Sequence, residues 1–310
     1  MTSLDDVRAA AARIAHVARR TPILDVEDPA TGRTFALKCE NLQRTGAFKL
    51  RGAYNMLAQL PPAARSAGVI AYSSGNHAQA VAYAAQQLGI RATIVMPEHA
   101  TAVKVAGTRR FGADVIFAGR TSLDRQLRAE QEAAARGLTI VPPFDHPWII
   151  AGAGTTGLEI LEQCPNVAEV YVPMGGGGQI AGVSAAIKQT RPSVRIVGVE
   201  PTGAARMTAS RAAGRPVTLE RTESIADGLL TLTPGTVTFA HVQAFVDDVV
   251  TVDDRAIAEA QRWLFEVARL VAEPSGAASV AAVLAATGPV HRSVAIVSGG
   301  NVGTPPAASA

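Results

Sequence analysis

One stretch of this 310-residue chain gives the clearest indication of its fold: Val170-Tyr171-Val172-Pro173-Met174-Gly175-Gly176-Gly177-Gly178-Gln179-Ile180. It combines a short apolar strand, four consecutive glycines and the start of a helix. A strand that is apolar throughout is typical of a sheet covered on both faces. Four glycines cost chain entropy, and they would let backbone N–H groups at a helix N-terminus point at one phosphate or carboxylate. The stretch therefore predicts a covered α/β sheet with an anion site at its edge, although a tight glycine turn remains the simpler alternative.

The same alternation of strand and helix continues along the chain. The apolar runs predicted as strands are 35–38, 69–72, 93–96, 114–117, 139–141, 170–173, 195–200, 249–252 and 294–297. The segments with helical periodicity are 76–88, 123–136, 180–190, 254–271 and 275–286. This alternation predicts an α/β fold with mostly parallel sheets flanked by helices. Because ligands of such folds bind at the carboxyl ends of strands, the loops that follow the apolar runs are the candidate site.

Composition narrows the class of protein. Apolar residues make up 48% of the chain and charged residues 18%, as in a globular enzyme. The net charge of +3 is scattered, without the basic stripe that nucleic-acid binding favours. Cys39 and Cys164 have neither CxxC nor metal-site spacing, which favours a reducing compartment. With no signal-peptide core and no long apolar span, a cytoplasmic protein is expected.

One lysine stands out in the stretch Thr45-Gly46-Ala47-Phe48-Lys49-Leu50-Arg51-Gly52-Ala53-Tyr54, which leads into a helical pattern. The 29 basic residues include only four lysines, at positions 38, 49, 104 and 188. A buried lysine can lose its proton and form an imine, whereas an arginine cannot. If the protein performs amine–carbonyl chemistry, Lys49 is therefore the lysine best placed for it.

Three further loops are unusual. Ser73-Ser74-Gly75-Asn76-His77 follows the strand 69–72 and opens a helix, so it is either a second anion site or an ordinary N-cap. Ser298-Gly299-Gly300-Asn301 follows the last strand, where a glycine turn would suffice. The segment 143–155 is rich in turn residues and could be a domain crossover.

Together, the lysine stretch, the Ser-Ser-Gly-Asn-His loop, the tetraglycine and the Ser-Gly-Gly-Asn loop resemble the threonine dehydratase/serine racemase family in order and spacing. This is the β-family, or fold type II, of pyridoxal-phosphate enzymes, and the resemblance runs from a first helical pattern at residues 7–18 to Val302. It implies a two-domain, tryptophan synthase β-like fold. Residues 1–57 and 147–310 would form the large cofactor-binding domain and 58–146 a small mobile domain. A homodimer or tetramer is implied as well.

The resemblance also implies roles for individual residues. Lys49 would hold pyridoxal 5'-phosphate as an internal Schiff base, with Phe48 packed near the ring. Asn76 would bind the ring hydroxyl, and Ser298 would face the ring nitrogen. The cofactor phosphate would be held by Gly175, Gly176, Gly177 and Gly178. The substrate carboxylate would be held by Ser73, Ser74, Gly75, Asn76 and His77.

The implied reaction is α,β-elimination from a β-hydroxy amino acid. A neutral serine at the ring nitrogen makes the ring a milder electron sink, which favours prompt loss of the β-hydroxyl. Threonine would give 2-oxobutyrate and serine pyruvate, each with ammonia. Ser74 matches the acid/base of serine racemases, so racemisation stays an alternative, as does a dehydratase of hydroxyaspartate or another 3-hydroxy amino acid. A non-catalytic anion-binding module and β-replacement are weaker rivals.

Three positions depart from the family pattern. Ala47 stands where the family has a serine before the Phe-Lys pair, which removes one hydroxyl. Glu200 and Ala204 match two ligands of the divalent cation of metal-dependent racemases, but the third position is Arg206. Because a cationic side chain opposes Mg²⁺ or Ca²⁺, no metal is expected. Pro143-Phe144-Asp145 resembles the dehydratase form of the crossover.

Overall fold

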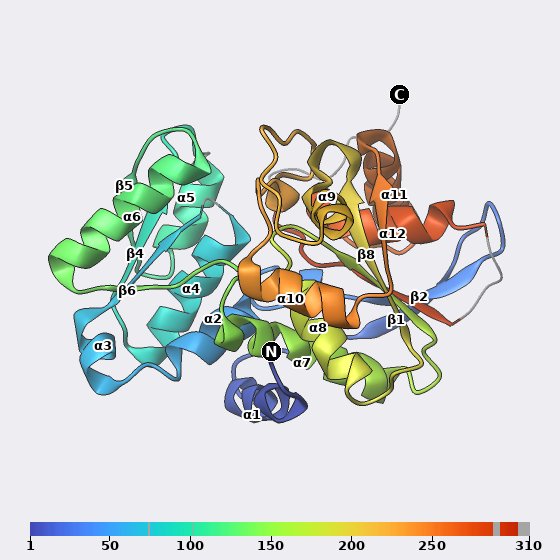
Figure 1. Cartoon of the computed structure of the whole chain (residues 1–310), viewed down its shortest axis with the longest axis horizontal. Helices are drawn as coiled ribbons and strands as arrows, with labels where there is room; N and C mark the ends of the chain where they lie inside the picture. Colours follow the sequence, from blue (N-terminus) through green and yellow to red (C-terminus); the bar gives the residue numbers. More distant parts are fainter. Residues whose placement is uncertain (74, 101, 288–291, 303–310) are drawn as a thin grey trace.

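The structure is a computed structural model that describes residues 1–73, 75–100, 102–287 and 292–302. Within these ranges, two α/β units lie side by side (Figure 1). The larger sheet has the order β1-β2-β10-β7-β8-β9 and the smaller one β5-β4-β3-β6. All of their strand pairs are parallel except β1 with β2. The predicted α/β class with mostly parallel sheets is confirmed.

The strands have the following bounds. In the large sheet they are β1 Ile23–Glu27, β2 Thr34–Lys38, β7 Glu169–Pro173, β8 Arg195–Pro201, β9 Asp248–Val252 and β10 Ser293–Ile296. In the small sheet they are β3 Val69–Tyr72, β4 Ala92–Met96, β5 Asp114–Phe117 and β6 Thr139–Ile140. Each predicted strand is present within one residue at either end, and only β1 was not predicted. Its half-exposed residues form the antiparallel edge.

Helices cover both sheets. Their bounds are α1 Leu4–Ile14, α2 Lys49–Leu57, α3 Pro62–Ala67, α4 Asn76–Leu88, α5 Ala102–Arg109, α6 Ser122–Arg136, α7 Pro147–Gln163, α8 Gly178–Lys188, α9 Arg206–Ala213, α10 Thr236–Phe245, α11 Asp254–Glu266 and α12 Pro274–Ala285. The expected helix 254–271 is wrong at its end, because α11 stops at Glu266 and Arg269 has a φ of 58°. Helices α7 and α8 cross closely, since a Cβ on Gly154 would lie 2.8 Å from the Gly182 carbonyl oxygen.

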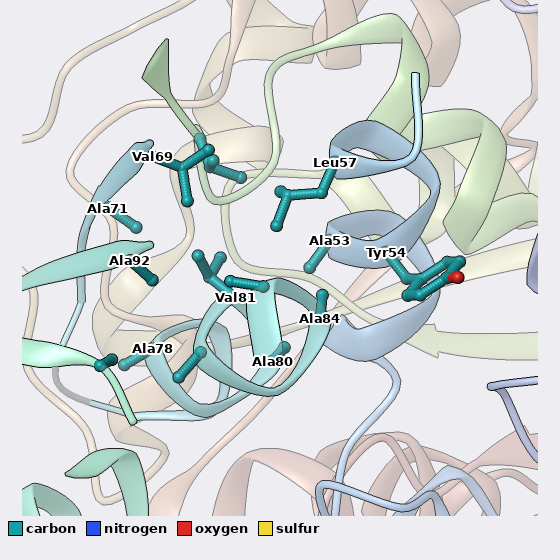
Figure 2. Close-up of a cluster of buried hydrophobic side chains, with 14 of the residues drawn as sticks. Ala53, Tyr54, Leu57, Val69, Ala71, Ala78, Ala80, Val81, Ala84 and Ala92 are labelled. Carbon is teal, nitrogen blue, oxygen red and sulfur yellow. The ribbon is translucent and has the colours of Figure 1, made fainter. Parts of the chain in front are cut away.

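Helix α2, which begins at Lys49, lies between the two units. Its apolar face, with Ala53, Tyr54 and Leu57, belongs to the core cluster that β3 and α4 share (Figure 2). Its opposite side packs against α7, where a Cβ on Gly52 would lie 2.8 Å from the Ile149 carbonyl oxygen. A movement of residues 58–146 as one body would therefore have to carry or shear this shared core. The division at residue 57 stays a prediction.

Buried ion pairs fix the same helix. The Arg51 guanidinium is 1% exposed and bonds to Glu40 at 2.8 Å and to Glu159 at 2.7 Å. Such planar, two-sided pairing of an arginine sets orientation as well as charge balance. Both cysteines are buried and free. In the described part of the chain, no helix has the length and apolarity needed to span a membrane.

Candidate active site

The lysine stretch, the Ser-Gly-Gly-Asn loop and the Ser-Ser-Gly-Asn-His loop lie together in the structure. Ala47 and Gly299 form an isolated antiparallel bridge, and the Phe48 N–H donates to the Ser298 carbonyl at 3.1 Å. Asn301 joins the third loop, because its Nδ2 donates to the Thr45 carbonyl and to Asn76 Oδ1, each at 2.8 Å. Residues that are 225 or more positions apart in sequence are thus linked directly.

Lys49 differs from the other lysines in its partner. The Lys49 residue as a whole is half-buried, and its amine donates to the Pro143 carbonyl at 2.7 Å. The others are each paired with a carboxylate: Lys38 with Glu159, Lys104 with Asp227 and Lys188 with Asp247. Burial lowers the pKa of Lys49 from 10.5 to about 8, and the nearby charge of Glu273 acts in the opposite direction. A much larger fraction of this amine is therefore neutral near pH 7 than in an exposed lysine.

The tetraglycine connects the carboxyl end of β7 to the N-terminus of α8. Within the described ranges, the N–H groups of these four glycines have no protein acceptor. Phe144 covers the loop, since a Cβ on Gly178 would lie 2.8 Å from that of Phe144. Gly177 has a φ of +98°, and a Cβ there would lie 2.9 Å from that of Thr238. Free N–H groups at a helix N-terminus, in a loop with no room for side chains, form an anion site.

The loop at residues 73–77 opens α4 at the carboxyl end of β3. The His77 ring is buried, and its Nε2 contacts the Val141 carbonyl oxygen at 2.9 Å. Burial lowers the pKa of His77 to about 3, so the ring is neutral and turned to the core. Its backbone N–H, with those of Gly75 and Asn76, is what a carboxylate could contact. Ser74 lies outside the described residues, and Ser73 precedes it at the strand end.

Two more predicted residues lie at the same place. Ser298, 5% exposed, follows β10, and its Oγ donates to the Ser275 carbonyl over a long 3.5 Å. A bond that long is weak, so the hydroxyl can exchange it for a better partner. The Phe48 ring centroid is 5.2 Å from Lys49 Nζ. Phe48 and Ser298 are therefore brought together with Lys49.

Glu273 was not predicted. It is 6% exposed, stands immediately before α12, and accepts a hydrogen bond from Asn76 Nδ2 at 2.5 Å. Burial raises the pKa of Glu273 to about 7, against the effect of the Asn76 bond. The sequence shows only an acidic residue before a Pro-Ser-Gly helix start and carries no signal that places it beside Asn76. The site thus contains an acid that can hold or release a proton near neutral pH.

Glu200 and Ala204, the two weak candidates for a metal site that was not expected, both contact a cation of the chain itself. The buried guanidinium of Arg206 donates to the Ala204 carbonyl and lies 3.7 Å from Glu200 Oε1. Glu200 also accepts the N–H groups of Met207 and Thr208, each at 2.9 Å. Among the described residues, no group of three or more His, Cys, Asp or Glu side chains could hold a metal.

Comparison with known proteins identifies the class. Residues 14–299 match the family described as pyridoxal-phosphate dependent enzymes. An L-threonine ammonia-lyase of Thermotoga maritima is 45% identical over 308 residues, covering 97% of this chain and 76% of that protein. An L-threo-3-hydroxyaspartate ammonia-lyase of a Pseudomonas species is 40% identical, covering 97% and 96%. The structure of maize serine racemase has a TM-score of 0.93 at 40% identity, covering 97% of this chain and 94% of that one.

The chain therefore belongs to the pyridoxal-phosphate dependent enzymes, and its fold is that of fold type II. The resemblance to the threonine dehydratase/serine racemase family is confirmed, and pyridoxal phosphate is the cofactor. The residues fit this cofactor. Unpaired glycine N–H groups suit its phosphate, and an amine with a lowered pKa suits its aldehyde.

Proposed function

We propose that this enzyme is a threonine ammonia-lyase that also deaminates serine. The observation that carries the proposal is the position of Lys49, whose amine reaches the Pro143 carbonyl while its loop is bonded to Ser298 and Asn301. The names of the relatives support the same activity, because two of those that are 45% identical are L-threonine ammonia-lyases. A threonine deaminase structure, 41% identical, has a TM-score of 0.92.

The cofactor would be contacted at five points. Lys49 would bind its aldehyde as a Schiff base, and the tetraglycine N–H groups would bind its phosphate. Asn76 would contact the ring hydroxyl through its second Nδ2 hydrogen, because the first is directed to Glu273. Ser298 would meet the ring nitrogen as a neutral partner, and Phe48 would pack beside the ring.

The loop at residues 73–77 would then bind the substrate, and Lys49 would accept its proton. The bound cofactor supplies an electron sink for the pair released when the Cα–H bond breaks. The substrate carboxylate would lie on the N–H groups of residues 73–77. Freed from the cofactor, the Lys49 amine would accept the Cα proton, which requires its neutral form. Overall, threonine loses water across Cα–Cβ and later gains water at Cα. The products are 2-oxobutyrate and ammonia, which together contain all the atoms of threonine.

A substrate panel tests the proposal. Holoenzyme would be given the L- and D-forms of threonine and serine and L-threo-3-hydroxyaspartate, with 2-oxo acid detection and chiral analysis of the remaining amino acid. We expect the highest kcat/KM for L-threonine. A preference for hydroxyaspartate would move the enzyme to that ammonia-lyase class, and D-serine accumulating faster than pyruvate would make it a racemase. Ser74→Ala would then be expected to suppress racemisation while elimination continues.

The pH dependence of cofactor capture should follow the lowered pKa of Lys49. Only the neutral amine attacks an aldehyde, so the capture rate of pyridoxal phosphate by the stripped enzyme should rise with pH and reach half its maximum near pH 8. The charge of Glu273 raises the pKa of Lys49, so Glu273→Gln should shift the midpoint to lower pH. Stopped-flow absorbance measures both. A wild-type midpoint near 10 would show that burial does not depress this pKa.

Chelation should leave the enzyme active. Arg206 supplies a cation between Glu200 and the Ala204 carbonyl, so we propose that no divalent metal is needed there. Dialysis against excess EDTA, followed by assay with and without added Mg²⁺, is expected to change kcat for L-threonine by less than twofold. A loss that Mg²⁺ restores would place a functional metal in this enzyme.

We also propose that the enzyme is a cytoplasmic homodimer or homotetramer whose residues 58–146 close over the substrate. Closure would exclude water while the reactive product is still bound. Light scattering of the purified holoenzyme measures the assembly, and a monomer mass would contradict it. Small-angle scattering with and without a substrate analogue should show a smaller radius of gyration when the analogue is bound.

A further inference from the structure

Side chains from distant elements donate hydrogen bonds to the carbonyls of the tetraglycine loop. Three consecutive ones, those of Met174, Gly175 and Gly176, each accept a side-chain hydrogen bond. The donors are Arg206, at the start of α9, and Thr238, in the first turn of α10. Buried carbonyls are normally hydrogen-bonded, and the notable feature here is that the donors are side chains from elements far along the chain.

Arg206 provides two of the three bonds. Its Nη2 donates to the Met174 carbonyl at 2.5 Å and its Nε to the Gly175 carbonyl at 3.1 Å. The side chain is 0% exposed, and its remaining contacts are the Ala204 carbonyl and, at 3.7 Å, Glu200. A rigid fork of N–H donors can hold two successive carbonyls at once, which a lysine amine on a flexible stem does less well.

Thr238 provides the third bond. Its Oγ1 donates to the Gly176 carbonyl at 2.6 Å, closer than its other acceptor, the Gly235 carbonyl at 3.1 Å, and the side chain is 0% exposed. The Gly176 carbonyl also accepts the Gly235 N–H, at 3.3 Å. The helix that carries it is itself fixed, because Asp145 Oδ1 accepts the N–H groups of Val237 and Thr238, each at 3.0 Å. Asp145 follows Phe144, the residue that covers the glycines. The threonine is therefore positioned from the same crossover that contacts Lys49.

Because of the geometry of the peptide unit, the bonds to these carbonyls also set the direction of the following N–H groups. In a trans peptide, the C=O of one residue and the N–H of the next point in opposite directions. Every peptide bond between described residues is trans. Holding the carbonyls of residues 174, 175 and 176 therefore directs the N–H groups of Gly175, Gly176 and Gly177 away from Arg206 and Thr238. These are N–H groups without a protein acceptor in the described ranges.

We propose that Arg206 and Thr238 are positioning residues for the cofactor phosphate, which act through the loop carbonyls and never touch the phosphate. The inference rests on the proposed phosphate-binding role of the tetraglycine. Glycine is the least restricted residue, so four in a row would sample many conformations without such bonds. The bonds fix the loop in advance, and the phosphate then meets donors that already point at it.

A comparison of two cofactor forms tests this directly. Full-length enzyme stripped of cofactor would be titrated with pyridoxal phosphate and with pyridoxal, which has the same aldehyde and ring but no phosphate. The Kd of pyridoxal divided by the Kd of pyridoxal phosphate measures how much the phosphate group contributes to binding. We expect Arg206→Lys and Thr238→Val to reduce that ratio by about tenfold or more, the scale of one hydrogen bond to a charged group. Binding of pyridoxal itself should be unchanged.

Matched variants separate positioning from general damage. Thr238→Ser keeps the hydroxyl and should keep the wild-type ratio. Thr208→Val removes a hydroxyl that contacts Glu200 from the same helix as Arg206 but does not touch the loop, and it should also keep the ratio. If Arg206→Lys does not fold, the comparison of Thr238→Val with Thr238→Ser still tests the proposal.

Two results have distinct meanings. If wild type binds pyridoxal as tightly as pyridoxal phosphate, the proposed phosphate site fails, and this inference with it. If wild type discriminates, but Arg206→Lys and Thr238→Val keep the same ratio or weaken both ligands equally, the positioning role alone is overturned.

Discussion

Lys49→Ala is expected to lower kcat for L-threonine by about 10³-fold or more, the middle of the range that removal of a general base costs. The amine is proposed both to hold the cofactor and to accept the Cα proton, and the other three lysines are each paired with a carboxylate. Lys38, 0% exposed, is committed to Glu159. The measurement is 2-oxobutyrate formation at saturating cofactor.

Two variants sharpen the lysine prediction. Lys49→Arg should be as inactive as Lys49→Ala, because arginine keeps its proton and cannot form an imine. Lys188→Ala removes a lysine whose amine pairs with Asp247, and it should retain wild-type kcat. A Lys49→Ala enzyme with more than a tenth of wild-type activity would show that another group performs these steps.

Gly177→Ala is expected to weaken pyridoxal phosphate binding by about 100-fold, near the upper cost of adding a methyl group to a filled site. The new Cβ would lie 2.9 Å from that of Thr238 at a φ of +98°, a backbone region that side chains disfavour. The loop must shift, and its N–H groups then lose their common direction. Equilibrium titration of the stripped enzyme measures the loss.

The control for this glycine is Gly214→Ala. Gly214 has a φ of +69° after α9, and a Cβ there would meet nothing within 4 Å. It carries the backbone strain without the collision, so Tm should fall while cofactor affinity stays at the wild-type value. Equal loss of affinity in both variants would mean that strain, and not the shape of the loop, explains the effect.

The sequence allowed much of the fold to be predicted because the strands are short, apolar and bounded by clear turns. The strand 170–173, its glycines and the following helix were found nearly at their observed bounds. The half-exposed β1 was missed, because its five residues lack the continuous apolar character of a covered strand. The end of α11 was missed because its periodicity continues past Glu266, and the positive φ of Arg269 cannot be seen in sequence.

The site was less completely predictable. Loops that follow neighbouring parallel strands meet at one edge, so the meeting of Lys49 and Ser298, which follow β2 and β10, could be expected from topology. Asn76 follows β3 of the other sheet, so its place beside them needed the structure. Which side chain completes a network depends on tertiary contacts, and so Glu273 was overlooked although it bonds to Asn76. Arg206 was recognised as an obstacle to a metal, but its bonds to the carbonyls of Met174 and Gly175 needed the structure.

Reductive trapping tests most directly whether Lys49 is the cofactor lysine. The holoenzyme would be treated with borohydride, which fixes the link between the cofactor and its lysine, then digested and mapped by mass spectrometry. We expect the phosphopyridoxyl group on the peptide that contains Lys49, with the peptides of Lys38, Lys104 and Lys188 unmodified. Label at any of those three lysines in place of Lys49, or protein that retains no label, would contradict it.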